Sequence, residues 1–314
     1  MKRLILALLA WVALAAHADD FDYRLEPRAV APDVYVFVGK TEDFDTRNGG
    51  NIVNTGFIVG PQGVVVIDTG PSLRYGRQMR QAIARVTDKP VLMAINTHHH
   101  PDHFLGNQAF SDVPLGSLAE VQRGIASEGN AFAENLFRMS GDWMSGTEVV
   151  VPTRALQAGP LEVGGRRLRL LALDGHTGAD LALLDEGSGV LFAGDLVFND
   201  RAPTTPHAQV ARWMASLDTL EAMVAGGGVK VLVPGHGPVS RDAQPIRLTR
   251  DWLTWLSGSL RQAAADGLDM NEILARPLPE RYRTLPVAPA EYRRSVGHLL
   301  PGIEVEALEA GHGH

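Results

Sequence analysis

Short apolar runs and one helical pattern alternate in the first third of the chain. The segments 34–38, 51–59 and 63–68 are rich in β-branched residues and are separated by turn residues, which predicts three strands. Residues 72–86 carry apolar side chains at helical spacing, and 91–96 predicts a further strand. This β–α–β order indicates a right-handed crossover in a sheet that helices cover.

The second half of the chain repeats this organisation. Strands are predicted at 168–173, 181–184 and 190–193, the last two as a hairpin. A helix at 210–225 and a strand at 229–233 follow. Two such halves indicate an α/β (α+β) fold in which two mixed sheets lie face to face with helices outside.

Two longer helices are also predicted, at 118–144 and 248–265. The apolar residues of the first favour core packing, although an apolar flap over a site is the alternative. Residues 269–314 are rich in proline and give no clear pattern. The buried face of the second helix is expected to hold Trp252, Trp255 and Leu256.

The N-terminus has the pattern of a secretory signal. A basic start at 1–3 precedes an apolar stretch at 4–16, and small residues at Ala16 and Ala18 suit a signal peptidase. The apolar stretch is shorter than the roughly 20 residues that span a bilayer. We therefore expect a signal peptide at 1–18, no membrane anchor after its cleavage, and a periplasmic or secreted protein that starts near Asp19.

Composition narrows the possible chemistry. The formal net charge is −7 and no long run of Lys and Arg occurs, so no nucleic-acid partner is expected. The chain has no cysteine. A metal site would therefore use His and carboxylate ligands, a set that suits zinc, iron or manganese.

The segment from His98 to His103 is the strongest chemical signal. In an extended chain His98, His100 and Asp102 would point to one side, whereas His99 would point away and not bind metal. A turn would then bring His103 to the same place. So many ligand-type side chains in six residues favour two neighbouring metals.

Three further residues of ligand type follow predicted strands in loops of small residues: His176, Asp195 and His236. A surface histidine cluster with incidental affinity for nickel or copper is the alternative interpretation. Convergence of all seven residues, with no cysteine among them, instead indicates a catalytic site that leaves a position for water.

This pattern resembles the metallo-β-lactamase superfamily over about 34–238, which implies an αββα sandwich. The resemblance implies a catalytic domain at 19–245 and leaves a C-terminal helical extension and tail at 246–314. It also implies that Asp68 orients the ligand loop, although a turn-forming role explains this residue nearly as well. The implied ligands are His98, His100 and His176 for one metal, Asp102, His103 and His236 for the second, and Asp195 as the bridge.

More narrowly, the segments 49–56, 98–107, 193–198 and 201–207 resemble the exported quinoprotein relay system zinc metallohydrolases. That resemblance implies a functional link to a pyrroloquinoline quinone-dependent dehydrogenase and leaves the reaction open.

The first functional hypothesis is a hydrolase with two Zn²⁺ ions that activate water, with Asp102 as a catalytic proton acceptor. Its substrate would be a small ester, thioester or amide, including a lactam. One alternative is a sulfur-compound dioxygenase with one Fe²⁺, since zinc has no redox chemistry. Another is a non-catalytic accessory protein of a quinoprotein.

Other residues carry weaker signals. His207 is either a partner of the site or exposed, and Asn51 and Asn54 either face the site or serve a turn. Arg201 or the pair Arg293-Arg294 could hold substrate carboxylates, although solvation is the simpler role. The histidines His312 and His314 are expected in a tail with incidental metal affinity.

Overall fold

The computed structural model describes residues 21–311 of the 314-residue chain. The expected signal peptide at 1–18 lies outside this range, as do His312 and His314. Within it, no helix is both long enough and apolar enough to cross a membrane.

The N-terminal half forms a seven-stranded sheet in which the strands follow one another in chain order. Neighbouring strands are antiparallel from β1 to β4 and parallel from β4 to β7. The crossover between β4 and β5 is the β–α–β unit predicted from the sequence. The strands are β1 (Arg28–Ala31), β2 (Val34–Phe37), β3 (Thr55–Val59), β4 (Val64–Ile67), β5 (Val91–Ile95), β6 (Leu115–Leu118) and β7 (Arg154–Leu156).

The C-terminal half forms a five-stranded sheet in the order β12-β11-β10-β9-β8. Strands β10 and β11 are the predicted antiparallel hairpin, and β12 pairs parallel to β11. The strands are β8 (Gly159–Val163), β9 (Arg166–Leu173), β10 (Asp180–Asp185), β11 (Val190–Phe198) and β12 (Val231–His236).

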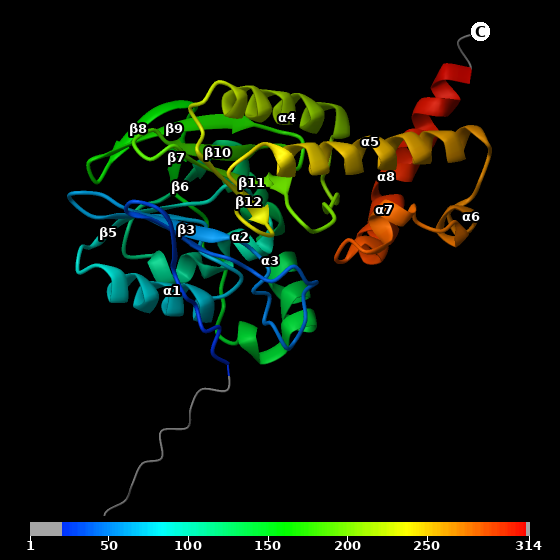
Figure 1. Cartoon of the computed structure of the whole chain (residues 1–314). Helices are drawn as coiled ribbons and strands as arrows, with labels where there is room; N and C mark the ends of the chain where they lie inside the picture. The colour runs from blue at the N-terminus through cyan, green and yellow to red at the C-terminus, as the bar shows by residue number, and fades with distance from the viewer. Residues whose placement is uncertain (1–20, 312–314) are drawn as a thin grey trace, which may run out of the picture.

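Helices cover the outer faces of both sheets, so the molecule has four layers (Figure 1). Helices α1 and α3 lie on the side of the first sheet, and α4 and α5 lie over the second. These helices are α1 (Leu73–Val86), α3 (Ala119–Ser140), α4 (Val210–Ala225) and α5 (Gln244–Ala265). Two short helices stand between β5 and β6, the α-helix α2 (Pro101–Phe104) and the 3₁₀ helix η1 (Leu105–Phe110).

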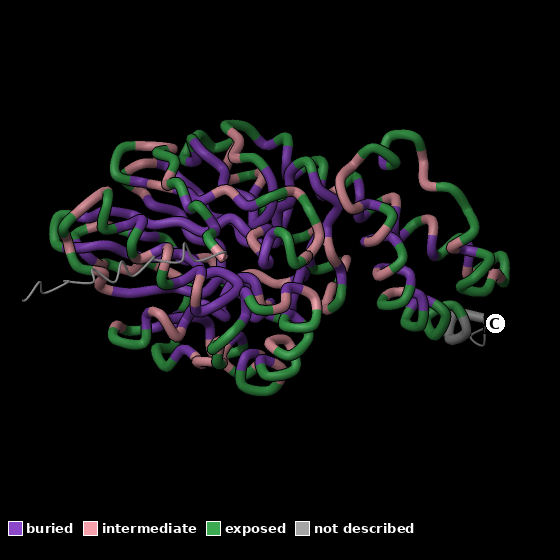
Figure 2. Tube along the Cα trace, turned by 90° about the horizontal axis from the view of Figure 1, so that it is seen from below, coloured by how far each residue is buried: buried purple, intermediate pink, exposed green. Residues whose placement is uncertain are grey.

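Apolar side chains fill each of the three spaces between the layers. Ile67 of the first sheet and Leu183 of the second belong to one buried cluster, which therefore lies between the sheets. Met79 of α1 packs with Phe57 on the outer face of the first sheet. Trp213 of α4 packs with β11 on the outer face of the second. Figure 2 shows the buried residues concentrated in this body. The αββα sandwich is confirmed.

The C-terminal helices extend to one side of the sandwich (Figure 1). They are α6 (Met270–Ala275), α7 (Glu280–Arg283) and α8 (Ala288–Gly311). Aromatic contacts tie them to α5: Tyr282 meets Trp252 edge to face, and Tyr292 packs near Trp255. Trp252 and Trp213 share one core cluster, so apolar packing is continuous across residue 245. The domain boundary there stays a prediction.

Three expectations from the sequence were wrong in detail. Residues 51–54 form a turn, and the third strand begins only at Thr55. The long helix at 118–144 instead comprises the last residue of β6, α3, and a 3₁₀ turn, η2 (Gly141–Met144), because Gly141 takes a positive φ of 62°. Trp255 is only half-buried, since it lies at the rim of the α5 surface that the C-terminal helices cover.

Candidate metal centre

The seven His and Asp residues singled out from the sequence lie together at the carboxyl ends of the central strands, where open α/β sheets place their sites. All seven are buried, and none exposes more than 6% of its surface. They form two groups whose possible ligand atoms lie within 4.8 Å of one another. The groups are His98, His100, His176 and Asp195, and Asp102, His103 and His236.

The segment after β5 departs from the expected extended conformation. His98 and His100 face one pocket as alternation predicted, and Pro101 then starts the helical turn α2. Proline is favoured at the first position of a helix because its fixed φ suits it. Asp102 therefore lies in a helix with His103, and the expectation that it would share a face with His98 and His100 is wrong.

The first group surrounds His176, which the loop between β9 and β10 carries. Its Nε2 lies 2.9 Å from Nδ1 of His100 and 3.4 Å from Oδ2 of Asp195. Nε2 of His98 lies 3.9 Å from the same Asp195 oxygen. Three imidazoles and one carboxylate thus converge from separate elements.

The second group lies on the other side of Asp195. His103 Nε2 is 3.1 Å from Asp195 Oδ1, and His236 Nε2 is 3.2 Å from Asp195 Oδ2. Asp102 Oδ2 lies 3.5 Å from His236 Nε2 and 3.9 Å from His103 Nε2. Asp195 is therefore the residue that both groups share.

A strand irregularity delivers Asp195 to this position. The residue was expected in a loop after its strand, but it lies inside β11 next to Gly194, which has a φ of +54° and interrupts the register with β12. Gly235 of β12 passes so close that an added Cβ would stand 1.9 Å from Asp195 Oδ1. The small residues on both strands are thus needed for the approach.

Hydrogen bonds fix which ring nitrogen of three histidines faces the centre. His103 Nδ1 donates to Asp68 Oδ2 at 2.8 Å, and His236 Nδ1 donates to the carbonyl oxygen of Ile52 at 2.8 Å. The hydroxyl of Thr97 donates to Asp68, so it accepts from His98 Nδ1 at 3.1 Å. Each bond places the proton on Nδ1 and leaves the lone pair of Nε2 towards the centre.

His100 is oriented from the opposite ring nitrogen. Glu128 Oε2 lies 3.1 Å from His207 Nε2, which therefore carries the proton and donates to the carboxylate. His207 Nδ1 is then an acceptor and lies 3.0 Å from His100 Nε2. His100 accordingly directs Nδ1 to the centre. Of the two roles considered for His207, its contact with His100 favours that of a partner of the site.

Burial determines the protonation state of the three histidines in the first group. Removal from water lowers the pKa of His98 and His100 well below the usual value, and lowers that of His176 to about 3. These rings are neutral at physiological pH, which is the form that binds metal. In the second group burial again lowers the pKa of His103, but the carboxylates of Asp195, Asp68 and Asp102 outweigh it and raise the pKa.

Several of these buried atoms make no hydrogen bond within the described part of the chain, and they face one another. Ligand atoms about 2.1 Å from a tetrahedral ion lie about 3.4 Å apart, and the separations here run from 2.9 to 3.9 Å. The residues therefore fit bound metal ions, which would give the atoms that face the centre a partner. The atoms that face the centre without a hydrogen bond are His98 Nε2, Asp102 Oδ2, His103 Nε2 and Asp195 Oδ1. Nδ1 of His176 also lacks one, but it is the ring nitrogen opposite the Nε2 that lies near Asp195.

Supporting residues were only partly recognised from the sequence. Asn54 serves the fold, because its side-chain amide donates to the carbonyl oxygens of Pro234 and Gly237 and so holds the loop of His236. Asn51 has its backbone in the same turn. Glu128 was missed, since no pattern in a single sequence connects α3 with residue 207.

The arginines considered for substrate binding are mostly engaged elsewhere. Arg201 is buried and pairs with Glu291 at 3.2 Å, and Arg294 pairs with Glu291 and Asp43. These contacts fasten α8 to the loop that precedes β3. Arg293 is exposed.

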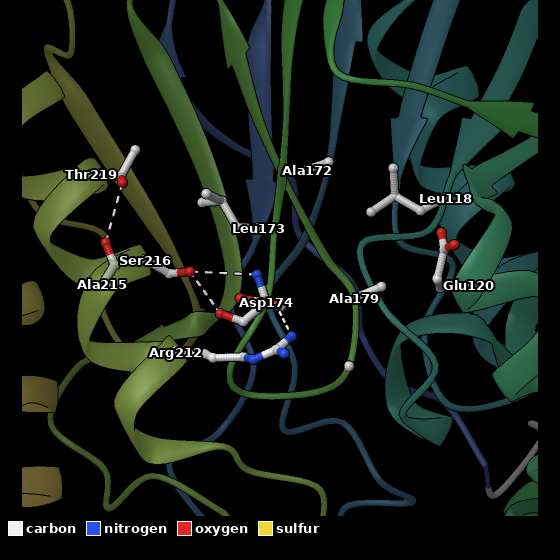
Figure 3. Close-up of a pocket in the computed structure, with 11 residues that line it drawn as sticks. Leu118, Glu120, Ala172, Leu173, Asp174, Ala179, Arg212, Ala215, Ser216 and Thr219 are labelled. Atoms are coloured by element: carbon white, nitrogen blue, oxygen red, sulfur yellow. Dashed lines mark hydrogen bonds and ion pairs between the residues drawn. The ribbon is translucent and has the colours of Figure 1, made fainter.

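A surface pocket of about 470 Å³ lies beside the loop that carries His176 (Figure 3). Arg212 donates to Asp174 at 2.8 Å, and Ser216 donates to the Asp174 carbonyl oxygen at 2.6 Å. None of the seven clustered residues lines this pocket. Its charged groups are paired, so it supports the His176 loop and offers no second centre.

Comparisons with known proteins agree with this geometry. The family model of the metallo-beta-lactamase superfamily matches residues 48–236, which is more than half of the chain. The acyl-coenzyme A thioesterase of Homo sapiens is 28% identical over 65% of this chain and 80% of its own length. A linear primary-alkylsulfatase of a Pseudomonas species is 23% identical over 70% of this chain, but the match spans only 48% of the sulfatase.

Among solved structures, a metallo-beta-lactamase from Pontibacter korlensis superposes with a TM-score of 0.60 and 21% identity. The match covers 74% of this chain and 99% of that one, and at this identity it shows the fold alone. The expectations of a metallo-hydrolase and of its family are confirmed: the chain belongs to the metallo-beta-lactamase superfamily.

Proposed function

We propose that this protein is a zinc-dependent hydrolase that uses two metal ions to cleave a small acyl ester or thioester. The observation that supports this proposal most directly is the position of Asp195 between the two groups. Its carboxylate oxygens lie 3.4 Å from His176 Nε2 on one side and 3.1 Å from His103 Nε2 on the other. A carboxylate between two sets of imidazoles is suited to bridge two cations.

Held by these residues, two zinc ions would supply Lewis acidity, acidifying a water molecule towards a pKa of ~7 and polarising the carbonyl of the substrate. His98, His100 and His176 would hold one ion, and Asp102, His103 and His236 the other. The hydrogen bonds from Nδ1 of His98, His103 and His236 keep their rings fixed. Little reorganisation is then needed during the reaction.

Asp102 is the proposed proton acceptor. It lies on the first turn of α2, buried, and its Oδ2 makes no hydrogen bond among the described residues. A carboxylate that faces the centre without a protein donor is free to orient the attacking water or to take its proton. It would pass that proton to the leaving oxygen or sulfur as the bond between this atom and the carbonyl carbon breaks.

An acyl substrate is favoured by the surroundings and by the relatives. The ring of Phe132 of α3 stands 6.1 Å from the ring of His100 and places an apolar side chain beside the centre. The named thioesterase relatives act on acyl-coenzyme A, a substrate with an apolar chain and a good leaving group. We therefore rank esters and thioesters ahead of lactams for this chain.

We further propose that the protein is exported and acts beside a quinoprotein dehydrogenase. The support is the signal-like pattern at 1–18 and the sequence resemblance to exported quinoprotein relay system hydrolases. Detection of the native protein in a periplasmic fraction supports export, and its retention in the cytoplasm contradicts it.

Hydrolysis assays test the reaction. The purified chain is incubated with acyl-coenzyme A thioesters, a p-nitrophenyl ester, a linear alkyl sulfate and a β-lactam, before and after removal of metal with a chelator. We expect thioester or ester cleavage that chelation abolishes and Zn²⁺ restores. Asp195→Asn should lower kcat by at least about 100-fold. The control, Asp200→Asn, changes an exposed residue five positions away and should retain kcat.

Wild-type rates in Asp195→Asn, or hydrolysis that survives complete metal removal, would overturn the proposed mechanism. Oxygen consumption with a sulfur compound, in place of hydrolysis, would point to the iron-dependent alternative.

A further inference from the structure

A second group of ligand-type side chains lies just outside the centre. His99 comes from the loop after β5, Glu128 from α3, and His207 from the segment between β11 and α4. Ligand atoms of His99 and His207 lie within 4.8 Å of each other and of His100, and the Glu128 carboxylate lies beside both outer rings. Hydrolysis as proposed above uses neither His99 nor Glu128 directly.

His99 is the unusual member of this group. Only 8% of it is exposed, and its Nε2 makes no hydrogen bond within residues 21–311. The ring fits against Gly124 of α3, where an added Cβ would stand 2.8 Å from the ring. A buried nitrogen without a hydrogen bond is costly, so a ring nitrogen that lies 3.6 Å from Glu128 Oε1 would be stabilised by a further partner.

We propose that His99, Glu128 and His207 form a further divalent-cation site at the entrance of the centre. His99 Nε2 lies 3.6 Å from Glu128 Oε1, and His207 Nε2 lies 3.1 Å from Glu128 Oε2. These values lie on either side of the roughly 3.4 Å that separates ligands of a tetrahedral ion. Two imidazoles and one carboxylate suit Zn²⁺, Ni²⁺ or Cu²⁺ better than Mg²⁺ or Ca²⁺.

The site is weaker than the inner centre. It offers three protein ligands, and the side chains of Glu128 and His207 are 41% and 31% exposed, so water completes the coordination. The ion therefore binds when free metal is abundant, after the buried ligands have been filled.

A metal ion in this outer site disturbs the inner centre. This step rests on the proposed function, which assigns His100 to the first metal. A metal ion bound to His207 Nε2 replaces the proton that this nitrogen donates to Glu128 in a hydrogen bond. Neutral His207 then carries its proton on Nδ1. His207 Nδ1 and His100 Nε2, which lie 3.0 Å apart, then both carry a proton and neither can accept. The hydrogen bond that orients His100 is therefore lost. Excess metal thus acts as an inhibitor.

Metal titration tests the inference with Zn²⁺ and, for its spectrum, Co²⁺. Binding is followed against a chromophoric chelator in the wild type, in His99→Gln, and in the control Glu134→Gln, which changes an exposed α3 residue away from the site. We expect a third, weaker ion in the wild type and the control that is lost in His99→Gln. At excess Zn²⁺ the rate of hydrolysis should fall several-fold in the wild type and the control, which bind the third ion, and not in His99→Gln.

Two tight ions without a third, or a third ion that survives in both His99→Gln and Glu128→Gln, overturns the outer site and leaves the hydrolase proposal standing. Failure to bind two ions tightly overturns the hydrolase proposal instead. Should His99→Gln fold poorly, which circular dichroism reports, Glu128→Gln alone decides, because the Glu128 side chain is 41% exposed and the oxygen of the new amide can still accept from His207.

Discussion

The carboxylate of Asp68 lies 2.8 Å from Nδ1 of His103, across 35 residues of chain. The same carboxylate accepts from the backbone and hydroxyl of Thr97, each at 2.8 Å. One residue at the end of β4 therefore fixes both the ligand loop and the tautomer of a proposed ligand. The role in orientation that the superfamily resemblance implied agrees with this geometry.

Asp68→Asn should weaken binding of the second metal by about 10- to 100-fold. An amide has one accepting oxygen, so it cannot accept both from Thr97 N at one position and from the Thr97 hydroxyl and His103 at the other. Competition with a chromophoric chelator measures the affinity of each ion. Asp88→Asn, at an exposed position, is the control. Equal affinity in Asp68→Asn and the wild type would show that this contact does not position His103.

Asn54→Ala should destabilise the fold by about 3 kcal/mol. The buried side chain accepts from Gly39 N and donates to the carbonyl oxygens of Pro234 and Gly237, so its removal leaves three backbone groups without partners. Urea unfolding measures the loss. A change below about 0.5 kcal/mol would mean that the two halves do not depend on this residue.

Glu291→Ala should cost about 3–5 kcal/mol, because it leaves the guanidinium of Arg201 charged and buried. Glu304→Ala, on an exposed face of the same helix, should be nearly neutral. Thermal and urea unfolding of both variants give the comparison. If the two variants are equally stable, α8 is not fastened to the sandwich through Arg201.

Gly237→Ala should destabilise the protein by more than about 4 kcal/mol. Its φ is +90°, and an added Cβ would stand 1.6 Å from the carbonyl oxygen of Asn199. Gly267→Ala is a matched control: its φ is +71° with no atom near the added Cβ, so only the backbone cost of about 1–2 kcal/mol applies. Similar unfolding free energies for both variants would contradict the clash beside His236.

Much of the fold and most of the centre were accessible from the sequence because their signals are local. The buried run at β4, the helical spacing of α1 and the strand-terminal histidines each depend on a few neighbouring residues. The αββα sandwich and the metallo-beta-lactamase superfamily are accordingly confirmed. Zinc, export and the quinoprotein link stay predictions.

The remainder depends on contacts that no local pattern encodes. His207 reaches His100 across 107 residues, and Asn54 reaches the loop of His236 across 180. The bulge that turns Asp195 inward follows from the pairing of β11 with β12. Pro101 suits a first helical position and could have predicted the start of α2. The alternation of His98 and His100 instead favoured an extended chain.

The measurement that tests the central claim most directly is the metal content of the full chain, purified without a polyhistidine tag and dialysed to remove weakly held ions. Mass spectrometry of the metals should find about two zinc ions per chain in the wild type, and fewer in Asp195→Asn. About one iron ion per chain with little zinc, or no tightly bound metal at all, would contradict the two-metal hydrolase.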